Sequence, residues 1–534
     1  MVGQPVREPG GWDDSGTAGG SVLRAPTRDA PRVFIPNEET DNVGIAIDEL
    51  GPGDLIDVGR GRLPVRSLIP AGHKVALDDL APGDLIFKLG HRIGEATVSI
   101  GAGEHVHSHN LGVRRDRPAT EAAGGLDDGT AWRPPVVPTQ DHFLGYRRPD
   151  GRVATRNYIG ILPSVNCSAT VARLAAAAAG AQIAGLPGCD GVIALTHGLG
   201  CALAPGTYGD VLLRRTLRGY AVHPNLAGVI VVALGCEVNQ PENFLGGSAA
   251  KVAHVSIQEL GGTNATVAAL VHQVVAMATG LQQLERESVP LSELTLGLQC
   301  GGSDAASAIT ANPTLGVASD LLVAAGGRVI LGETPEIIGA EQLLRRRAVT
   351  PEIAQRIDKT IAWWLDYAAR NGAVVDHNPS PGNREGGITT IWEKSLGAFL
   401  KGGSSPLRDV VEYAQPVVEP GLTFMDTPGY DPVSATGMVA GGAGILAFTT
   451  GRGSVFGSRP VPCLKISSTT QLYERMSDDI DFDAGSATTR ALQVERGVEL
   501  FDALVRAASG EPTKSEGLGF GAEEIVPWNV GAVL

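Results

Sequence analysis

Cysteine is scarce in this chain, with 6 among 534 residues. So few cysteines exclude a disulfide-rich scaffold and indicate reduced thiols, as found in the cytoplasm. Long apolar runs are also missing, since none approaches the ~20 residues that a transmembrane helix requires. The first residues lack the apolar core of a secretory signal. We therefore expect a cytoplasmic protein with no membrane partner.

Positive charge is in short supply as well. Lysine and arginine together number 43, aspartate and glutamate number 58, and the formal net charge is −15. Nucleic acids and anionic membranes bind cationic surfaces, so an acidic chain without a long basic run is a poor partner for either. An anionic small molecule would need a locally positive site within this acidic protein.

Motifs of several common enzyme classes are absent. There is no GxxxxGK[ST] phosphate loop, and no GxGxxG with a downstream acidic residue follows a strand-like run, so nucleotide binding has little support. The GxSxG signature of α/β-hydrolases does not occur. The cysteines include no CxxC pair, which makes the signal for a closed structural zinc site weak.

The length predicts about three or four domains of ~150 residues, and 43% hydrophobic residues are enough to fill sizeable cores. Short apolar runs separated by Pro-Gly turns are followed, beyond residue 140, by strand-like runs that alternate with helical periodicity. We therefore expect an α/β protein in which a small all-β domain precedes two α/β domains with mainly parallel sheets. The expected segments are a tail (1–38), the β domain (39–110), a linker (111–140) and α/β domains over 141–288 and 289–534.

Two helices are predicted in some detail. Helical periodicity extends from Thr263 to Ser288, and a long amphipathic helix over residues 351–371 ends at Gly372, a suitable C-cap. Strands are expected between the helical segments, at residues 158–165, 191–197, 227–236, 294–300, 328–334, 444–451 and 461–467.

Reactive side chains follow the carboxyl ends of these strands, where functional groups gather in parallel sheets. They are Cys167, His197 with Cys201, Cys236 with Glu237, and Cys300. Each cysteine taken alone could be a small buried apolar residue. Four at equivalent topological positions favour ligands for iron, for zinc or for an iron–sulfur cluster.

Three histidines, His105, His107 and His109, are spaced by two residues. On a β-strand this spacing places all three on one face, where they could ligate a divalent metal. Glu104 could add an oxygen ligand. The alternative is a solvent-facing strand end with a few ordering hydrogen bonds.

Two polar, glycine-rich loops are candidates for anion binding. Residues 377–387 offer Asn378, Asn383 and Arg384 as donors, and residues 449–460 offer Arg452, whose planar guanidinium suits a carboxylate. Arg156 could clamp a carboxylate too. The alternatives are ordinary turns for the loops and a surface ion pair for Arg156.

The motifs DGRVATRNYIGILPSVNCSATVAR, THGLGC, ALGCE, LQCGGSDAASAITANPTLG, HNPSPGNREGGITTIWEKSLG and FTTGRGSVFG together resemble the altronate/galactarate dehydratase family. The segments PAGHKVAL and IGAGEHVHSHN resemble the SAF (β-clip) domain of that family. The resemblance covers residues 41 to 534, and EHVHSHN and GETPEIIGAEQLL favour altronate dehydratases over galactarate dehydratases. Sulfolactate sulfo-lyases are also similar.

The resemblance implies a hydro-lyase that removes water from a sugar acid to give a 2-keto-3-deoxy acid. It implies a divalent metal, Fe²⁺ first and Mn²⁺ second, and leaves an iron–sulfur cluster open. A homo-oligomer is expected. A sugar-acid-binding protein without turnover and an iron–sulfur redox protein are the competing classes. The site residues inferred are His197, Glu237 and His107 for catalysis; Arg156, Asn157, Ser303, Asp304, Asn383 and Arg452 for substrate binding; and Cys167, Cys201, Cys236, Cys300, His105 and His109 for the metal.

Overall fold

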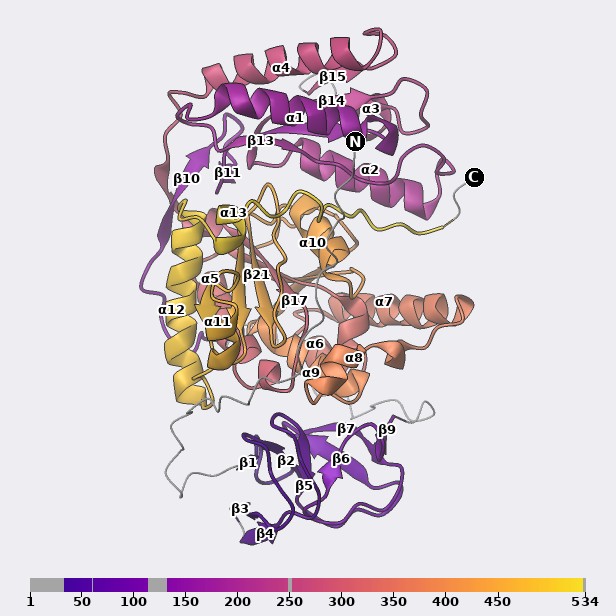
Figure 1. Cartoon of the computed structure of the whole chain (residues 1–534), viewed down its shortest axis with the longest axis vertical. Coiled ribbons are helices and arrows are strands. Elements are labelled where there is room, and N and C mark those ends of the chain that lie inside the picture. The colour runs from indigo at the N-terminus through magenta and orange to yellow at the C-terminus, as the bar shows by residue number, and fades with distance from the viewer. Residues whose placement is uncertain (1–32, 60, 114–131, 248–251, 532–534) are drawn as a thin grey trace, which may run out of the picture.

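The computed structural model describes residues 33–59, 61–113, 132–247 and 252–531. Three bodies follow one another along the long axis of the molecule (Figure 1): a small β domain, a large α/β domain around a seven-stranded sheet, and an α/β domain around a four-stranded sheet. The large domain, which comes last in the sequence, lies in the middle. The expected tail up to residue 32 and residues 114–131 of the expected linker lie outside the described residues.

The small domain consists of short antiparallel strands joined by Pro-Gly turns, as the sequence predicts. The first strand, β1, lies in the segment assigned above to the tail, because Val33 and Phe34 pair with Ala46 and Ile45. One sheet has the order β1-β2-β5-β8, a second has the order β6-β7-β9, and β3 pairs with β4. The strands are β1 Val33–Phe34, β2 Val43–Ala46, β3 Leu55–Asp57, β4 Arg62–Pro64, β5 Lys74–Ala76, β6 Leu85–Lys88, β7 His91–Ala96, β8 His105–Val106 and β9 Leu111–Gly112.

A three-stranded antiparallel sheet joins the two α/β domains. It has the order β11-β10-β16, with β10 His142–Arg147, β11 Val153–Ala154 and β16 Glu287–Pro290. The helix predicted over residues 263–288 ends earlier, at Gly280. Its last part is strand β16 because residues 287–290 pair with 142–145 of β10, and such long-range pairing outweighs local helical periodicity.

The smaller α/β domain has a parallel sheet of order β13-β12-β14-β15. Alternate residues of β14 face opposite sides: Ile230 packs in the same core as α1 and α4, whereas Val231 packs toward the large domain. Helix α2 lies on that second side (Figure 1). The elements are β12 Tyr158–Pro163, α1 Ala169–Ile183, β13 Gly191–Ala194, α2 Tyr208–Ala221, β14 Leu226–Ala233, α3 Pro241–Leu245, β15 Ala253–Ser256 and α4 Thr263–Gly280, with the short 3₁₀ turn η1 Asn166–Ser168.

The large domain has a parallel sheet of order β19-β20-β18-β17-β21-β22-β23. The chain leaves β17 on one side and later returns to β21 on the other, so the strand order reverses beside β17, and ligands bind at such points in open α/β sheets. The strands are β17 Thr295–Cys300, β18 Arg328–Leu331, β19 Leu407–Val411, β20 Gly421–Met425, β21 Ile445–Thr450, β22 Cys463–Ser467 and β23 Phe482–Asp483.

Helices cover both faces of this sheet (Figure 1). The long helix α7 ends at Arg370, and Gly372 follows it with φ +66°, consistent with the predicted cap. The helices are α5 Ala311–Ala324, α6 Glu341–Arg346, α7 Pro351–Arg370, α8 Pro381–Glu385, α9 Ile391–Phe399, α10 Asp431–Ala440, α11 Thr470–Arg475, α12 Arg490–Ala508 and α13 Lys514–Gly517, with 3₁₀ turns η3 Leu291–Glu293, η4 Ala306–Ala308, η5 Thr334–Ile337, η6 Val375–His377 and η7 Leu400–Gly402.

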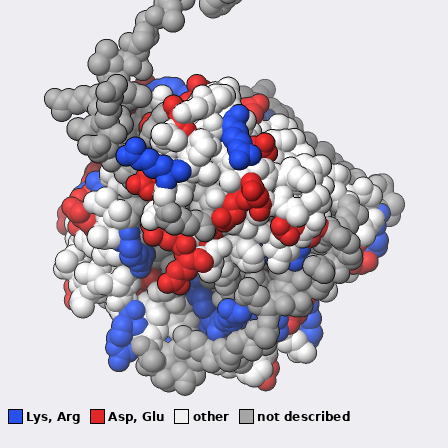
Figure 2. All heavy atoms as spheres, turned by 90° about the horizontal axis from the view of Figure 1, so that it is seen from below, with Lys and Arg blue, Asp and Glu red and all other residues white. Residues whose placement is uncertain are grey.

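The surface carries both signs of charge. Acidic and basic side chains lie interspersed on the face seen from below, where the small domain lies (Figure 2). The net charge of −15 is therefore not presented on that face as one acidic patch. No helix within the described residues has both the length and the hydropathy to cross a membrane.

Candidate active site

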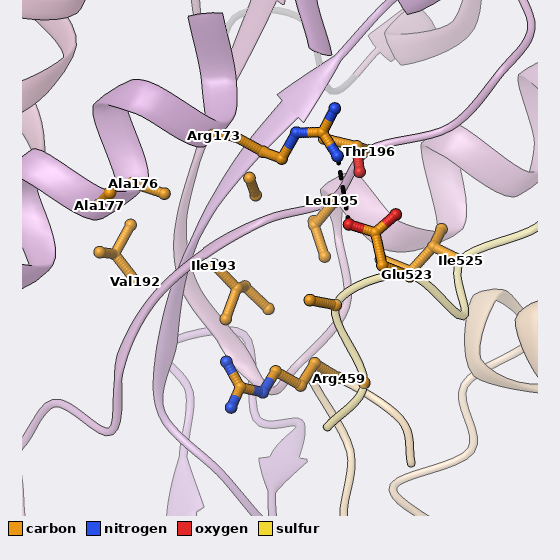
Figure 3. Close-up of a pocket in the computed structure, with 13 residues that line it drawn as sticks. Arg173, Ala176, Ala177, Val192, Ile193, Leu195, Thr196, Arg459, Glu523 and Ile525 are labelled. Carbon is orange, nitrogen blue, oxygen red and sulfur yellow. Dashed lines mark hydrogen bonds and ion pairs between the residues drawn. The ribbon is translucent and has the colours of Figure 1, made fainter. Parts of the chain in front are cut away.

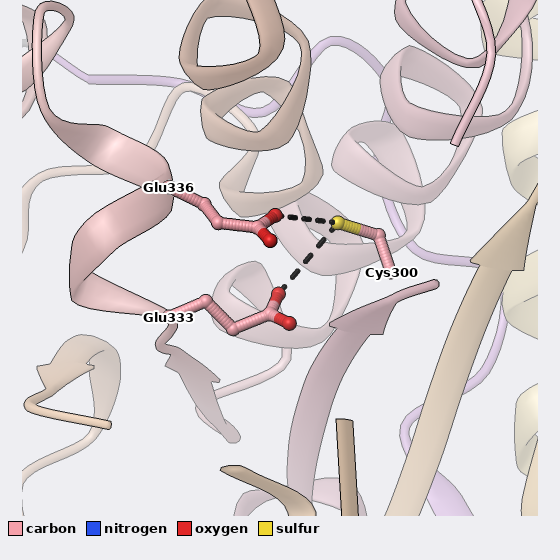
Figure 4. A group of neighbouring side chains, drawn as sticks. All are labelled: Cys300, Glu333 and Glu336. Carbon is pink, nitrogen blue, oxygen red and sulfur yellow. Dashed lines mark hydrogen bonds between the residues drawn. The ribbon is translucent and has the colours of Figure 1, made fainter. Parts of the chain in front are cut away.

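Cys300 is the last residue of β17 and faces two glutamates from the neighbouring strand β18. Its Sγ lies 3.6 Å from Oε2 of Glu333 and 3.6 Å from Oε2 of Glu336. Glu333 follows β18 and Glu336 lies in η5, and both carboxylates point at the sulfur (Figure 4). Across the part of the chain that the structure describes, this is the one group of three metal-ligating side chains whose ligand atoms all lie within 4.8 Å of one another.

Two buried lysines balance the charge of these glutamates. Nζ of Lys401 lies 2.8 Å from Oε2 of Glu333, and Nζ of Lys394 lies 2.7 Å from Oε1 of Glu336. Asn378 bridges the second pair, because its Nδ2 donates to Oε1 of Glu336 at 3.0 Å and its Oδ1 accepts from Lys394 at 2.9 Å. The lysines come from α9 and η7, which cover the carboxyl ends of β17 and β18.

Burial makes the protonation states of this cluster unusual. Burial, together with the charge of Glu333, raises the pKa of the Cys300 thiol. Burial also raises the pKa of Glu333, whereas at Glu336 the charges of Lys394 and Lys401 outweigh the effect of burial and hold its pKa below the ordinary value. Asp431, at the start of α10, has its pKa raised to about 8 by burial and by the two glutamate charges. It is therefore largely protonated at pH 7.

The donor set around Cys300 fits a divalent transition metal. Two carboxylates and one sulfur are ligand types that such ions accept, and none of the three is exposed to solvent. The buried Oε1 of Glu333 has no hydrogen-bond partner among the described residues. Glu333 is also held at φ +67°, a left-handed conformation that costs a non-glycine residue energy and is found at functional sites. Of the expected metal ligands, Cys300 is thus the one placed in such a group.

Gly301 fixes the position of Asp431 beside Cys300. A Cβ added at Gly301 would lie 2.2 Å from Oδ2 of Asp431 and 2.5 Å from Cζ of Phe448. Phe448 is fully buried and stacks on Phe456, with ring centroids 5.1 Å apart, so it has no free space to move into.

We expect Gly301→Ala to displace Asp431 and to lower both stability and activity. Overpacking of this kind costs about 1–3 kcal/mol of unfolding free energy, which urea denaturation would measure. The matched control is Gly382→Ala in α8, where an added Cβ would have no atom within 4 Å. Equal stability and equal activity in the two variants would contradict this role of Gly301.

Four histidines of the small domain form a cluster against helix α8 of the large domain. Nδ1 of His73 lies 3.0 Å from Nε2 of His105, and the ring centroids of His105 and His109 are 5.4 Å apart. The backbone oxygens of Glu385 and Arg384 accept from Nε2 of His73 (3.0 Å) and of His107 (2.9 Å). Burial lowers the pKa of His105 to about 3 and of His107 to about 4, so both rings are neutral at pH 7.

The histidine cluster exists, but the expectation that a β-strand places three histidines on one face was wrong. Strand β8 contains only His105 and Val106, and residues 107–110 form a turn. The rings meet because the turn folds back and because His73, which the sequence reasoning missed, precedes the neighbouring strand β5. Across the described residues, these histidines do not supply three ligand atoms within 4.8 Å of one another.

The expected substrate-binding residues of the large domain lie around α8. Nδ2 of Asn383 donates to the backbone oxygen of Ser303 at 2.8 Å. Asp304 accepts hydrogen bonds from Ser307 and Ser468. The exposed guanidinium of Arg452 lies 3.1 Å from Glu385. Arg452 therefore stays accessible to a ligand, while Asn383 and Asp304 connect the loop after β17 to its surroundings.

Arg156 and Asn157 require a correction, because the structure places both away from Cys300. The guanidinium of Arg156 pairs with Glu516 at 2.7 Å and also donates to the backbone oxygens of residues 155, 507 and 511. Nδ2 of Asn157 donates to the backbone oxygen of Gly188, and its backbone N–H donates to Asp190 at 2.5 Å. The contacts of Arg156 attach the smaller α/β domain to the C-terminal segment and leave none of its donors for a carboxylate.

The remaining expected residues lie in the smaller α/β domain, so four cysteines do not share one metal. Cys167, Cys201 and Cys236 are exposed there, whereas Cys300 is buried in the large domain. His197 is engaged at both ring nitrogens, with the oxygen of Pro163 at 2.9 Å and the N–H of Leu199 at 3.2 Å, and burial lowers its pKa to about 4. Glu237 accepts from Ser164 and from the N–H of Gly235. Neither residue is placed to exchange protons beside Cys300.

The sequence reasoning missed the glutamates and lysines around Cys300, and also Asp431, whereas it named Asn378 only as a donor of the loop 377–387. One signal was available: Glu333 and Glu336 directly follow the apolar run of β18, three residues apart. The lysines gave no such signal, because they reach the site from helical segments that lie 58 and 68 residues beyond their glutamate partners in the chain.

A cavity of about 310 Å³ lies elsewhere, between the outer edge of β13 and the C-terminal segment (Figure 3). Arg173 pairs with Glu523 at 3.2 Å on one side, and Arg459 lies on the other. Aliphatic side chains of α1 and β13, such as Ala176 and Val192, form much of the remaining wall. The three ligand side chains around Cys300 are not part of this cavity, so we do not assign the chemistry to it.

Three domain families match this chain in order. The SAF domain of altronate/galactarate dehydratases matches residues 32–114, and the second domain of D-galactarate dehydratase/altronate hydrolase matches residues 145–282. The C-terminal domain of D-galactarate/altronate dehydratase matches residues 291–533. The first of these matches covers the small β domain with its histidine cluster, and the last covers Cys300 and its neighbours.

Individual proteins match over most of their lengths. The altronate dehydratase of Bacillus subtilis (strain 168) is 34% identical over 507 residues, which cover 94% of this chain and 99% of the relative. The galactarate dehydratase (L-threo-forming) of Escherichia coli (strain K12) is 35% identical over 495 residues, 90% and 93% of the two chains. The (2R)-sulfolactate sulfo-lyase subunit beta of Chromohalobacter salexigens is 33% identical over 387 residues, 71% and 95%.

Proposed function

This chain belongs to the altronate/galactarate dehydratase family and is a hydro-lyase that acts on a sugar acid, and we propose that it converts altronate into 2-dehydro-3-deoxy-gluconate and water. The observation that carries the proposal is the buried group of Cys300, Glu333 and Glu336, with two lysines, at the carboxyl end of the central strand. Altronate is preferred over galactarate because residues 104–110 and 332–344 resemble altronate dehydratases.

The reaction removes the proton on C2, beside the carboxylate, and the hydroxyl on C3. Loss of the C2 proton puts negative charge on the carboxylate, and fixed positive groups in a water-excluded site stabilise such charge. Lys394 and Lys401 supply this positive charge. The anionic groups around them raise the pKa of both lysines, although burial acts in the opposite direction. A divalent cation bound at Cys300 and the two glutamates would add Lewis-acid stabilisation of the same charge.

Two kinds of proton carriers serve the two steps. Asp431, with a pKa of about 8, holds a proton at pH 7 and is assigned to donate it to the departing C3 hydroxyl. The neutral imidazole of His107 is assigned to accept the C2 proton at Nδ1, which lies 3.0 Å from the hydroxyl of Ser108, since its pKa of about 4 leaves the ring uncharged at pH 7. The small domain brings this imidazole to α8, whose Asn383 contacts the loop that follows Cys300.

The substrate assignment is tested with protein purified anaerobically, supplied with Fe²⁺ and incubated with altronate, galactarate and sulfolactate. We expect 2-keto-3-deoxy acid from altronate at a kcat/KM at least about tenfold above that for galactarate, the factor that about 1.4 kcal/mol of differential binding gives. Preference for galactarate would overturn the substrate but keep the reaction. Sulfite release from sulfolactate would overturn the hydro-lyase assignment.

The same assay tests the assignment of His107. In deuterated buffer, His107→Ala should stop deuterium uptake at C2 of altronate, while its metal content stays that of the unmodified protein. Unchanged exchange in the variant would remove His107 from this role.

A further inference from the structure

Three cysteines lie on loops that follow adjacent strands at the carboxyl edge of the smaller parallel sheet. Cys201, Cys167 and Cys236 follow strands β13, β12 and β14, which are adjacent in the sheet order. Neighbouring strands are about 4.8 Å apart, so the three loops begin within about 10 Å of one another. All three cysteines are free and exposed, and none of their sulfurs has a hydrogen bond to another described residue.

Hydrogen bonds of polar side chains hold these three loops together. Asn166, next to Cys167, binds the loop of Cys201 twice: its N–H donates to Leu199 at 2.9 Å, and its Nδ2 donates to His197 at 3.1 Å. On the other side, Nδ2 of Asn239 donates to the backbone oxygen of Ser164 at 2.8 Å, and Ser164 also donates to Glu237. The loop of Cys167 is thereby tied to both of its neighbours.

Local backbone geometry requires the same close approach. Gly200, directly before Cys201, has φ +110°, and a Cβ there would lie 2.5 Å from the oxygen of Ser164. Gly235, directly before Cys236, has φ +124°. Asn239 is 2% exposed, yet its Oδ1 has no hydrogen-bond partner among the described residues. Residues His197 and Glu237, expected above to act in catalysis, instead fix the loops that carry the thiols.

We propose that Cys167, Cys201 and Cys236 bind an iron–sulfur cluster of the [4Fe–4S] type, at a site separate from Cys300. Thiolates are the ligands that hold iron–sulfur clusters. Three cysteines would bind three irons and leave the fourth iron without a protein thiolate, open to a small oxygen ligand. This inference does not rest on the proposed dehydration of altronate.

The arrangement suits a cluster better than a single ion. Four ligands at ~2.3 Å around one tetrahedral ion bring sulfurs within about 4 Å of one another. The sulfurs of Cys167, Cys201 and Cys236 do not all lie within 4.8 Å, in contrast to the ligand atoms around Cys300. In a cluster each thiolate binds a different iron, so wider spacing is required. The exposed edge of the sheet also leaves room for iron and sulfide to enter.

The experiment is anaerobic reconstitution of the full chain with Fe²⁺ and sulfide, followed by removal of unbound iron. We expect equal amounts of iron and acid-labile sulfide beyond the mononuclear iron, and visible absorption that dithionite bleaches. At least half of the labile sulfide should be lost in each of the variants Cys167→Ser, Cys201→Ser and Cys236→Ser. Before reconstitution, each variant should have the same thermal unfolding temperature as the parent protein.

Matched controls are the other cysteines. Cys189→Ser alters a thiol of the same domain whose Sγ lies 3.5 Å from the oxygen of Gly191, and Cys300→Ser alters the other candidate metal site. Both should keep the full labile sulfide and visible absorption. Protein without labile sulfide, a single zinc or iron ion bound by the three thiols, or equal losses in the Cys189→Ser control would each overturn the proposal.

Discussion

Replacement of Cys300 by serine should reduce kcat/KM on the order of 10³-fold, or about 4 kcal/mol of transition-state stabilisation. Cys300 brings its Sγ to 3.6 Å from both Glu333 and Glu336. A serine hydroxyl is a shorter and harder ligand, so the variant loses the sulfur donor of the proposed metal site. Titration with Fe²⁺ should show weaker binding together with the loss of turnover, and kcat should fall more than KM rises.

The matched control for this variant is Cys463→Ser. Cys463 is the first residue of β22 in the same sheet, is fully buried, and has a pKa raised to about 12 by burial. It is not a member of the ligand group around Cys300. We expect it to cost stability but to leave Fe²⁺ affinity intact. Similar losses of Fe²⁺ binding in both variants would mean that packing of the sheet, not the sulfur donor, explains the effect.

Glu393→Ala should destabilise the protein by about 3–5 kcal/mol, the cost of leaving buried charges without their partner. Glu393 lies on α9 and receives two lysines from the small domain, Lys74 at 2.9 Å and Lys88 at 2.8 Å. Their side chains are 0% and 2% exposed. Thr389 adds two further hydrogen bonds to the same carboxylate. Guanidinium denaturation of the full chain would measure the loss of stability. The control is Glu287→Ala, which breaks an exposed ion pair with Arg147 and should cost at most about 1 kcal/mol.

The pH dependence of this loss has a definite sign. Burial holds the pKa of Lys74 at about 8, below its ordinary 10.5, even though Glu393 raises it. Without Glu393 the pKa in the folded state falls further. Between that lower value and about 8, folded Glu393→Ala has lost the Lys74 proton that the folded parent still holds, so the stability deficit of the variant should shrink as pH rises toward about 8 and then stay constant up to pH 10.

A triple variant separates charge from packing at this contact. Lys74→Met, Lys88→Met and Glu393→Leu together replace the buried charges with apolar side chains, a change that is often neutral or stabilising. Recovery of at least half of the lost stability is expected. A triple variant as unstable as Glu393→Ala would show that the contact depends on shape and not on unpaired charge.

The parallel sheets were readable from the sequence because their strands are buried on both faces. The apolar runs of β12, β14 and β17 give continuous signals that need no partner to be recognised. Strand β16 gave the opposite signal, since Glu287 and Ser288 are exposed and only the pairing with β10 makes the segment extended. Helix α12, which packs against α5 of the large domain, is not among the helices that the sequence predicts.

The site was only partly predictable, for a related reason. Cys300 could be singled out because it ends a buried strand. The glutamates could not be joined to it, since their proximity depends on β18 lying next to β17 in the sheet. Strand order could not be read from the sequence, and for this reason Cys300 was expected to share a metal with Cys167, although their strands belong to different sheets. Position at a strand end can be read from one segment, whereas convergence of two segments depends on strand order.

The contact between Lys74 and Glu393 also bears on how the chain matures during translation. The two residues are 319 positions apart, and ribosomes add about 5–20 residues per second, so about 15–60 s separate their synthesis. In that interval the nascent small domain carries two ammonium groups and an apolar surface that Ala340 and Leu396 later cover. Docking must therefore come late, and slow synthesis of the central region extends the time in which the nascent chain is open to chaperones and proteases.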